Sequence, residues 1–433
     1  MTPLRLQYLL TFAVMGSLLP YLSVYLEGRG LSRTEVGWVL SVQGLAIMVT
    51  PIAVTWLADT RLEPKRLLMA MAAGSALGLV GLAVAETFTV LLLFHAFYAL
   101  AFTAIPPTQD GLFFAAAGQR PIPAGQEGAA VAEEDTPSEP TTKRTGQAGG
   151  AGGHRYHLTR VFGTVGFILP SLALFVALRQ GVDLVWAVWA AVVSAGLLAV
   201  AAGWLPSVKR GSSAEPEKRE RAITSLPTAE AARVLTAPRV LGFCIAFWLL
   251  NLATGAYYSF YPVYLTDTVG IDQQWIGLIS NLGVATELGF MLGFGWLTQK
   301  FGLRGIAVAG AVVMGVRFGL LAGEPTAWVA VGTQLLHGPM VLAMHIVPPV
   351  YLAERAERVL GAERAAACRA SIHGLFFMLV VGTSRLVANP LGGALAEAPG
   401  TGGVGVGLTG LFWACGGVTA VALGVLVWPT RKG

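Results

Sequence analysis

The 433-residue sequence has few charged residues, because Asp, Glu, Lys and Arg together make up only 12% of it, whereas 55% is hydrophobic. Its mean hydropathy is +0.65. A soluble globular domain carries roughly twice this share of charge. Polar side chains are too few to cover a surface in contact with water, so the composition predicts a membrane protein.

Cysteine is also scarce, and the three present are Cys244, Cys368 and Cys415, in or beside apolar stretches and without C-x-x-C spacing. We therefore expect buried apolar side chains and neither a disulfide framework nor a metal site.

Motifs of common enzyme chemistry are missing as well. The sequence contains no H-E-x-x-H, no G-x-S-x-G and no phosphate-binding G-x-x-x-x-G-K-[ST]. We expect no enzyme activity, no cofactor and no ATP-driven transport by this chain alone. The net charge of +5 comes from short loops between apolar runs, which indicates membrane topology and not nucleic-acid binding.

Apolar runs of about 20 residues, enough to cross a bilayer core of roughly 30 Å, occur six times in each half. They begin near Leu6, Val36, Leu67, Phe88, His157 and Leu184, and then near Val240, Trp275, Gly305, Thr326, Ser371 and Val406. The run from Leu9 to Leu26 is too long for a signal-peptide core and has no cleavage site, so we interpret it as the first span. The expected fold class is all-α, with twelve transmembrane helices.

Lys and Arg gather on one side of these spans. With the N-terminus inside, the basic residues left outside are Arg29, Arg33 and Arg179. The positive-inside rule then predicts a multi-pass protein of the cell (inner) membrane with both termini and the central loop in the cytoplasm.

Two cytoplasmic segments differ in composition from the spans, namely residues 119–153 and 207–224, which are rich in Gly, Ala, Glu, Pro, Ser or Thr. We expect both to be flexible and neither to fold into a soluble domain. The first is either an inert or a regulatory insert. The predicted organisation is an N-terminal half (1–206), a linker (207–237) and a C-terminal half (238–433).

The two halves repeat each other in parallel at an offset of about 240 residues. The matching positions are Val24-Tyr25-Leu26 with Val263-Tyr264-Leu265, Gly30 with Gly270, Gly37 with Gly277, and Trp56-Leu57 with Trp296-Leu297. His95 before Pro106-Pro107 also matches His337 before Pro348-Pro349, at the same spacing. A parallel repeat implies a pseudo-two-fold axis along the membrane normal and a solute site between the halves.

The sequence resembles the major facilitator superfamily, and within it the branch of phenylpropionate permeases and nucleoside or lactose proton symporters. The resemblance covers nearly the whole chain and rests on Leu19-Pro20-Tyr21, Tyr25-Leu26, Gly30-Leu31-Ser32 with Gly37, and the run from Arg160 to Phe167. It implies two six-helix halves that move by alternating access.

The superfamily's loop G-x-x-x-D-R-x-G-x-R-R follows spans two and eight in altered form. The residues that this resemblance assigns to a conformational lock are Asp59, Arg61 and Arg66 in the first loop, and Gly295, Lys300 and Arg304 in the second. Gln299 stands in the second loop where the family has Asp, so the resemblance implies a charged lock for the N-terminal half alone.

Ionisable groups inside the membrane are costly and therefore functional candidates. The set predicted to form a proton-coupling and charge network is Glu287, Asp110, Arg160, Arg317, Arg385 and His337. Glu287 is either a proton carrier or a member of a structural pair, and Asp110 is expected to pair with Arg160 on adjacent helices. Arg385 is expected to meet an anionic solute or Glu287, whereas Arg317 meets a solute or extends to the interface. His337 is either a proton relay or a hydrogen-bonding residue between helices.

Polar and aromatic side chains in the spans are suited to a small ring-bearing solute. The predicted cavity residues are Tyr21, Tyr25, Gln43, Asn251, Tyr257, Asn281 and His345, with Tyr258 beside them. The sequence thus favours a monomeric secondary transporter whose partners are the lipid bilayer, protons and a small organic solute such as an aromatic acid or a nucleoside. Proton-driven efflux and a polytopic receptor or enzyme are the alternatives.

Overall fold

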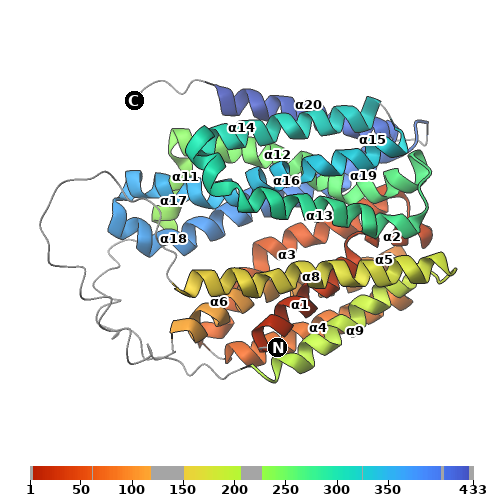
Figure 1. Cartoon of the computed structure of the whole chain (residues 1–433), viewed down its shortest axis with the longest axis horizontal. Coiled ribbons are helices and arrows are strands. Elements are labelled where there is room, and N and C mark those ends of the chain that lie inside the picture. The colour runs from red at the N-terminus through yellow and green to blue at the C-terminus, as the bar shows by residue number, and fades with distance from the viewer. Residues whose placement is uncertain are drawn as a thin grey trace, which may run out of the picture.

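The computed structural model describes residues 3–60, 62–118, 151–205, 227–323, 325–400 and 404–428. These residues form helices joined by short loops, with no strand among them. Figure 1 shows two bundles, with the N-terminal helices in the lower part and the C-terminal helices in the upper part.

The N-terminal half is built mostly from long helices. They are α1 (Pro3–Leu18), α2 (Leu22–Gly28), α3 (Arg33–Thr60), α4 (Pro64–Val84), α5 (Phe88–Phe102), α6 (Ile105–Gly118), α8 (Ala151–Arg179) and α9 (Val185–Ala202).

The C-terminal half contains more interruptions, including short π and 3-10 segments labelled η. Its elements are α11 (Pro227–Thr236), α12 (Pro238–Val263), η1 (Tyr264–Thr268), η2 (Gln273–Trp275), α13 (Ile276–Leu292), α14 (Phe294–Gly323), α15 (Ala327–Gly332), η3 (Thr333–Leu336), α16 (His337–Val341), η4 (Leu342–Ile346), α17 (Val347–Leu360), α18 (Ala362–Phe376), η5 (Phe377–Gly382), α19 (Thr383–Ala396) and α20 (Gly407–Val427).

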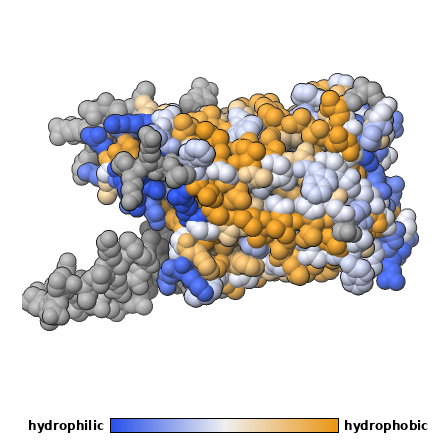
Figure 2. All heavy atoms as spheres, turned by 90° about the horizontal axis from the view of Figure 1, so that it is seen from above, coloured by the Kyte–Doolittle hydropathy of each residue, from blue (hydrophilic) through white to orange (hydrophobic). Residues whose placement is uncertain are grey.

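The helices agree with the predicted membrane spans. In the described part of the chain, ten helices are long and apolar enough to cross a membrane, and eleven if α1 and α2, bent by 42°, count as one span. The 28 residues of α3 lie where the second span is predicted. Figure 2 shows a broad apolar band across the face in view, with hydrophilic residues toward its two ends, as a bilayer requires.

Proline and glycine mark the breaks between helices. Pro20 lies between α1 and α2, and Pro238 begins α12 directly after α11. Gly302 has φ +68° and separates a short first segment of α14 from the ninth span. Glycine adopts this left-handed conformation without the steric cost that a Cβ brings, so the kink after span eight depends on it.

A hydrogen bond that recurs in both halves confirms the internal repeat in three dimensions. The Tyr25 hydroxyl donates to the carbonyl of Leu82 at 2.9 Å, and the Tyr264 hydroxyl donates to the carbonyl of Leu321 at 2.7 Å, across 57 residues in each case. The Pro-Pro pairs also lie in the first turns of α6 and α17, which begin at Ile105 and Val347.

The closely packed element pairs that join the halves are α3 with α19 and η5, α8 with α13 and η2, and α2 with α12. These contacts gather toward the end of the bundle where α3 begins at Arg33, which we call the Arg33 end; α20 ends toward the opposite end (Figure 1). Backbones approach closely there, because a Cβ on Gly37 would lie 2.3 Å from the carbonyl oxygen of Asn389.

Part of the predicted linker is helical. Residues 227–236 form α11, which packs against α17 and α18 through Ala231 and Val234, both fully buried. No pattern in the sequence indicated this docked helix. The predicted flexibility of residues 119–150 and 207–224 lies outside the described residues, and residues 151–153, which the sequence placed in the insert, belong to α8.

Candidate functional site

Tyr258 lies in the last third of α12, where 37% of its surface is exposed, whereas the adjacent Tyr257 is 1% exposed. Its ring lies edge-on to that of His337, with 6.0 Å between centroids. The ionisable side chains within electrostatic reach of its hydroxyl are Glu287, Arg317 and Arg385. We call Tyr258, Glu287, Arg317, His337, His345 and Arg385 the C-half polar site.

The helix that carries Glu287, α13, packs closely on α16, which begins at His337. Thr286 Oγ1 accepts the backbone N–H of Gly338 at 3.1 Å. A Cβ on Gly283 would lie 3.1 Å from Cγ of His337, so the absence of a side chain there lets the imidazole approach α13. Glu287 follows Gly283 by four residues and lies on the same face of the helix. Its side chain is half-buried.

Arg317 is completely buried, and the prediction that it extends to the membrane interface is wrong. Its Cζ lies 4.5 Å from the ring centroid of Tyr257 and 5.7 Å from that of Tyr261, within cation–π distance. Its Nη1 lies 3.5 Å from Nδ1 of His337. Counting residues along the span indicates how deep Arg317 lies in the membrane, but not which face of the helix carries it. In the structure that face points into the bundle.

Arg385 and His345 complete the C-half polar site. The Cγ atom of Arg385 would lie 3.8 Å from a Cβ on Gly255. The aliphatic part of the Arg385 side chain therefore packs against α12 about one turn before Tyr258. The imidazole of His345 is exposed and lies within electrostatic reach of Arg385. Five predicted network or cavity residues from four different spans therefore converge with Tyr258.

Two residues predicted to line the cavity contact the opposite half instead. Tyr21 is 1% exposed, and its hydroxyl oxygen would lie 2.3 Å from a Cβ on Gly277 of α13. The side-chain amide of Asn281 donates to Ser171 Oγ of α8 at 2.7 Å. Both contacts join the halves toward the Arg33 end.

Other predicted cavity residues make contacts within their own half. Tyr25 is 4% exposed and donates to Leu82, whereas Tyr257 packs on Arg317. The half-buried Asn251 donates to the Phe247 carbonyl of its own helix at 2.8 Å. Gln43 is half-buried in α3.

Asp110, in α6, accepts a hydrogen bond from the hydroxyl of Tyr8 in α1. The predicted partner of Asp110, Arg160, lies in α8, but its side chain is outside the described residues. The expected ion pair therefore stays a prediction.

The residues of the predicted lock contact their own halves where their side chains are described. Arg66 lies 3.8 Å from Glu63. Lys300 Nζ lies 4.9 Å from the ring centroid of Trp296, while Gly295 has open space around it. Arg304 donates to the carbonyl of Leu426 at 2.8 Å, at the end of α20. The side chain of Asp59 and the whole of Arg61 lie outside the described residues.

Sequence reasoning missed a charged cluster at the Arg33 end. Arg33 lies 3.0 Å from Glu27 in its own half and 2.6 Å from Asp267 in the other half. It also donates to the Ala396 carbonyl at 2.9 Å, and Glu397 accepts the backbone N–H of the next residue, Thr34, at 2.9 Å. The sequence used Arg33 only as a topology marker, since its partners are far along the chain.

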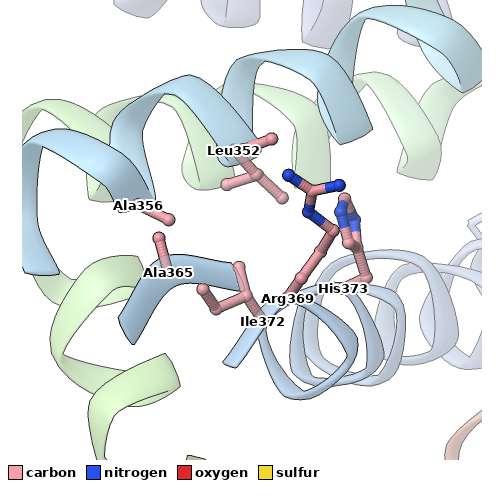
Figure 3. A pocket seen from close by; sticks show the side chains of 7 residues that line it. Leu352, Ala356, Ala365, Arg369, Ile372 and His373 are labelled. Atoms are coloured by element: carbon pink, nitrogen blue, oxygen red, sulfur yellow. The ribbon is translucent and has the colours of Figure 1, made fainter. Parts of the chain in front are cut away.

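Two surface hollows lie within the C-terminal half. Figure 3 shows one between α17 and α18, where Arg369 and His373 lie side by side near Leu352; it is too narrow for a solute. A more open hollow of about 480 Å³ lies beside Trp275 and Val331. Neither is lined by residues of both halves, as a solute site between the halves would require.

Comparison with known proteins agrees with this geometry. YegT of Escherichia coli (strain K12), named as a nucleoside transporter, is 22% identical over 89% of this chain and 81% of its own length. A protein of the same organism named as a 3-phenylpropionic acid transporter is 24% identical over 81% of this chain and 82% of its own length. The solved structure of the nucleoside transporter NupG superposes with a TM-score of 0.75 at 18% identity, over 100% of this chain and 99% of that one.

These similarities extend over both halves, and the fold they share is that of the major facilitator transporters. The model of the MFS_1 like family matches residues 1–123 and 144–401, which include almost every described helix. The chain therefore belongs to the MFS_1 like family of membrane transporters.

Proposed function

We propose that the protein is a proton-coupled symporter that carries a small organic solute across the cell membrane by alternating access. The observation that carries this proposal is the position of Glu287, a half-buried carboxyl group inside a membrane helix, within electrostatic reach of the exposed Tyr258. A carboxyl group that meets water from each side in turn can bind and release a proton in each cycle.

The charges of the C-half polar site favour a solute with an anionic group. Arg317 and Arg385 are always protonated, and Glu287 supplies one negative charge that disappears when it takes up a proton. A carboxylate entering with that proton would restore the charge balance and accept hydrogen bonds from Arg385. An aromatic monocarboxylate fits this site best, since Tyr258 offers an accessible ring.

Alternating access is supported by the asymmetry of the contacts between the halves. The closely packed pairs lie toward the Arg33 end, where glycines allow backbone contact. With the predicted topology, this is the outer end, and the state described is closed to the outside. Motion of one half against the other would open it.

Transport into liposomes that hold a pH dye tests the proposal. We expect 3-phenylpropionate, added without a membrane voltage, to acidify the lumen, and Glu287→Gln to abolish acidification while leaving solute exchange intact. Glu354→Gln, on an exposed face of α17, is the matched control and should behave as wild type. Labelled solute that enters without protons would rule out symport and leave a uniporter, whereas acidification by a nucleoside alone would reassign the solute.

A further inference from the structure

The contact between Arg317 and His337 constrains the chemistry of the imidazole. Nη1 of Arg317 lies 3.5 Å from Nδ1 of His337. A guanidinium group only donates hydrogen bonds and does not lose its proton in proteins. The nitrogen that faces it must therefore present a lone pair, which places the single proton of His337 on Nε2.

Burial reinforces this constraint. Arg317 is 0% exposed, and its Nε and Nη2 atoms have no hydrogen-bond partner among the described residues. Water does not screen its charge, so a second proton on His337 would place two cations side by side in a medium of low dielectric constant. The ionisable groups that face His337 are Arg317, Tyr258 of α12 and His345 of η4, and α13 approaches its ring at Gly283.

The other ring nitrogen is not a buried atom without a partner. His337 is half-buried, and Nε2 is absent from the buried polar atoms that lack a hydrogen-bond partner in the described part of the chain. The repeat partner in the N-terminal half, His95, differs, because it is 3% exposed and both of its ring nitrogens are buried without a partner among the described residues. The less buried histidine thus belongs to the half that also contains Glu287 and Arg385.

We infer that Arg317 is a positioning residue that holds His337 neutral with its proton on Nε2, so that His337 binds the solute as a fixed hydrogen-bond donor and carries no proton. The group it recognises is an acceptor oxygen, the carboxylate of an acid or a carbonyl of a nucleobase. This inference rests on the proposed function for the solute site, and it assigns proton movement to Glu287 alone.

Two substitutions of His337 separate a donor from a proton carrier. The amide nitrogen of Gln takes the place of Nε2 and cannot titrate, whereas Leu removes the donor. We expect His337→Gln to keep the proton-to-solute ratio and His337→Leu to weaken solute binding about tenfold, as loss of a hydrogen bond to a charged group does. The probes are 3-phenylpropionate and uridine. His373→Gln, near the α17–α18 hollow, is the control.

Removing the guanidinium gives a second readout. In Arg317→Met the imidazole of His337 no longer faces a buried cation and protonates more readily, so solute binding should acquire a titration that the wild type lacks. The double variant Arg317→Met with His337→Gln should lose it. A merely structural role of Arg317 would weaken binding without creating this titration.

Solute binding to the detergent-solubilised protein is measured in addition to transport. Failure of the symport proposal can then be distinguished from failure of the inference on His337. If wild type binds a probe but moves no proton, the symport proposal fails while the binding titrations still test His337. The inference is overturned if His337→Gln abolishes proton movement with solute exchange intact, or if folded Arg317→Met shows no new titration. Should Arg317→Met not fold, the His337→Gln and His337→Leu pair decides.

Discussion

Arg33 and Asp267 join the two halves of the transporter by an ion pair of 2.6 Å at the Arg33 end. The guanidinium side chain is 20% exposed and the carboxylate 45%, and Glu27 contacts the same guanidinium at 3.0 Å. Because the partners belong to different halves, the pair exists only while this end is closed. It therefore contributes to the balance between the two states of the cycle.

Arg33→Gln should shift that balance toward the state open at the Arg33 end. Partly exposed pairs contribute about 1 kcal/mol or less, so we expect a change in population of about fivefold or less. Spin labels at Glu86→Cys and Thr326→Cys, exposed positions in opposite halves, report the opening as a longer distance. The three native cysteines are buried and leave these labels specific.

Arg179→Gln is the matched control, because this arginine is exposed at the end of α8 and has no role in the predicted lock. Asp267→Asn should reproduce the shift, and the double variant should add little to either single change. An unchanged distance distribution in both single variants would show that the ion pair does not contribute to closure.

Gly37→Ala should open the same end more strongly than Arg33→Gln. The new methyl group would lie 2.3 Å from the carbonyl oxygen of Asn389, and backbone atoms cannot move aside as a flexible side chain does. Overpacking of this kind costs about 1–3 kcal/mol, paid only in the closed state. Gly196→Ala, where nothing lies within 4 Å, is the control for the substitution itself. A smaller shift than that of Arg33→Gln would contradict the argument.

The sequence was sufficient to predict the features of the fold that depend on the length of apolar runs and on local residue patterns. Span lengths follow from bilayer thickness, and the repeat follows from aligned motifs such as those of Tyr25 and Tyr264. It could not predict the burial of Arg317. Hydrophobic residues occur on every side of this helix, so no polar face indicates which side meets the other helices. The ion pair of Arg33 was equally hidden, since its partner Asp267 is 234 residues away.

Tyr25→Phe and Tyr264→Phe should each destabilise the protein by about 1 kcal/mol, because each removes one buried hydrogen bond to a helix carbonyl. The two losses should be similar, as the repeat makes the contacts equivalent. Thermal unfolding in detergent measures both, with the more exposed Tyr258→Phe as the control that leaves stability unchanged. Loss of stability confined to one half would mean that the repeated bond is not equally important in both.

Arg385→Gln should separate anionic from neutral solutes. A guanidinium that meets the carboxylate of 3-phenylpropionate provides a charge-assisted hydrogen bond of about 1.5–3 kcal/mol, so affinity for this probe should fall roughly tenfold to a hundredfold. Affinity for uridine, which has no carboxylate, should change less than threefold if Arg385 acts through charge. Arg304→Gln, whose guanidinium binds the end of α20 far from the C-half polar site, controls for loss of an arginine in the same half. Equal losses for both probes would mean that Arg385 supports the architecture of the site, for example through its stem against Gly255, and that the charge argument for a carboxylate solute is wrong.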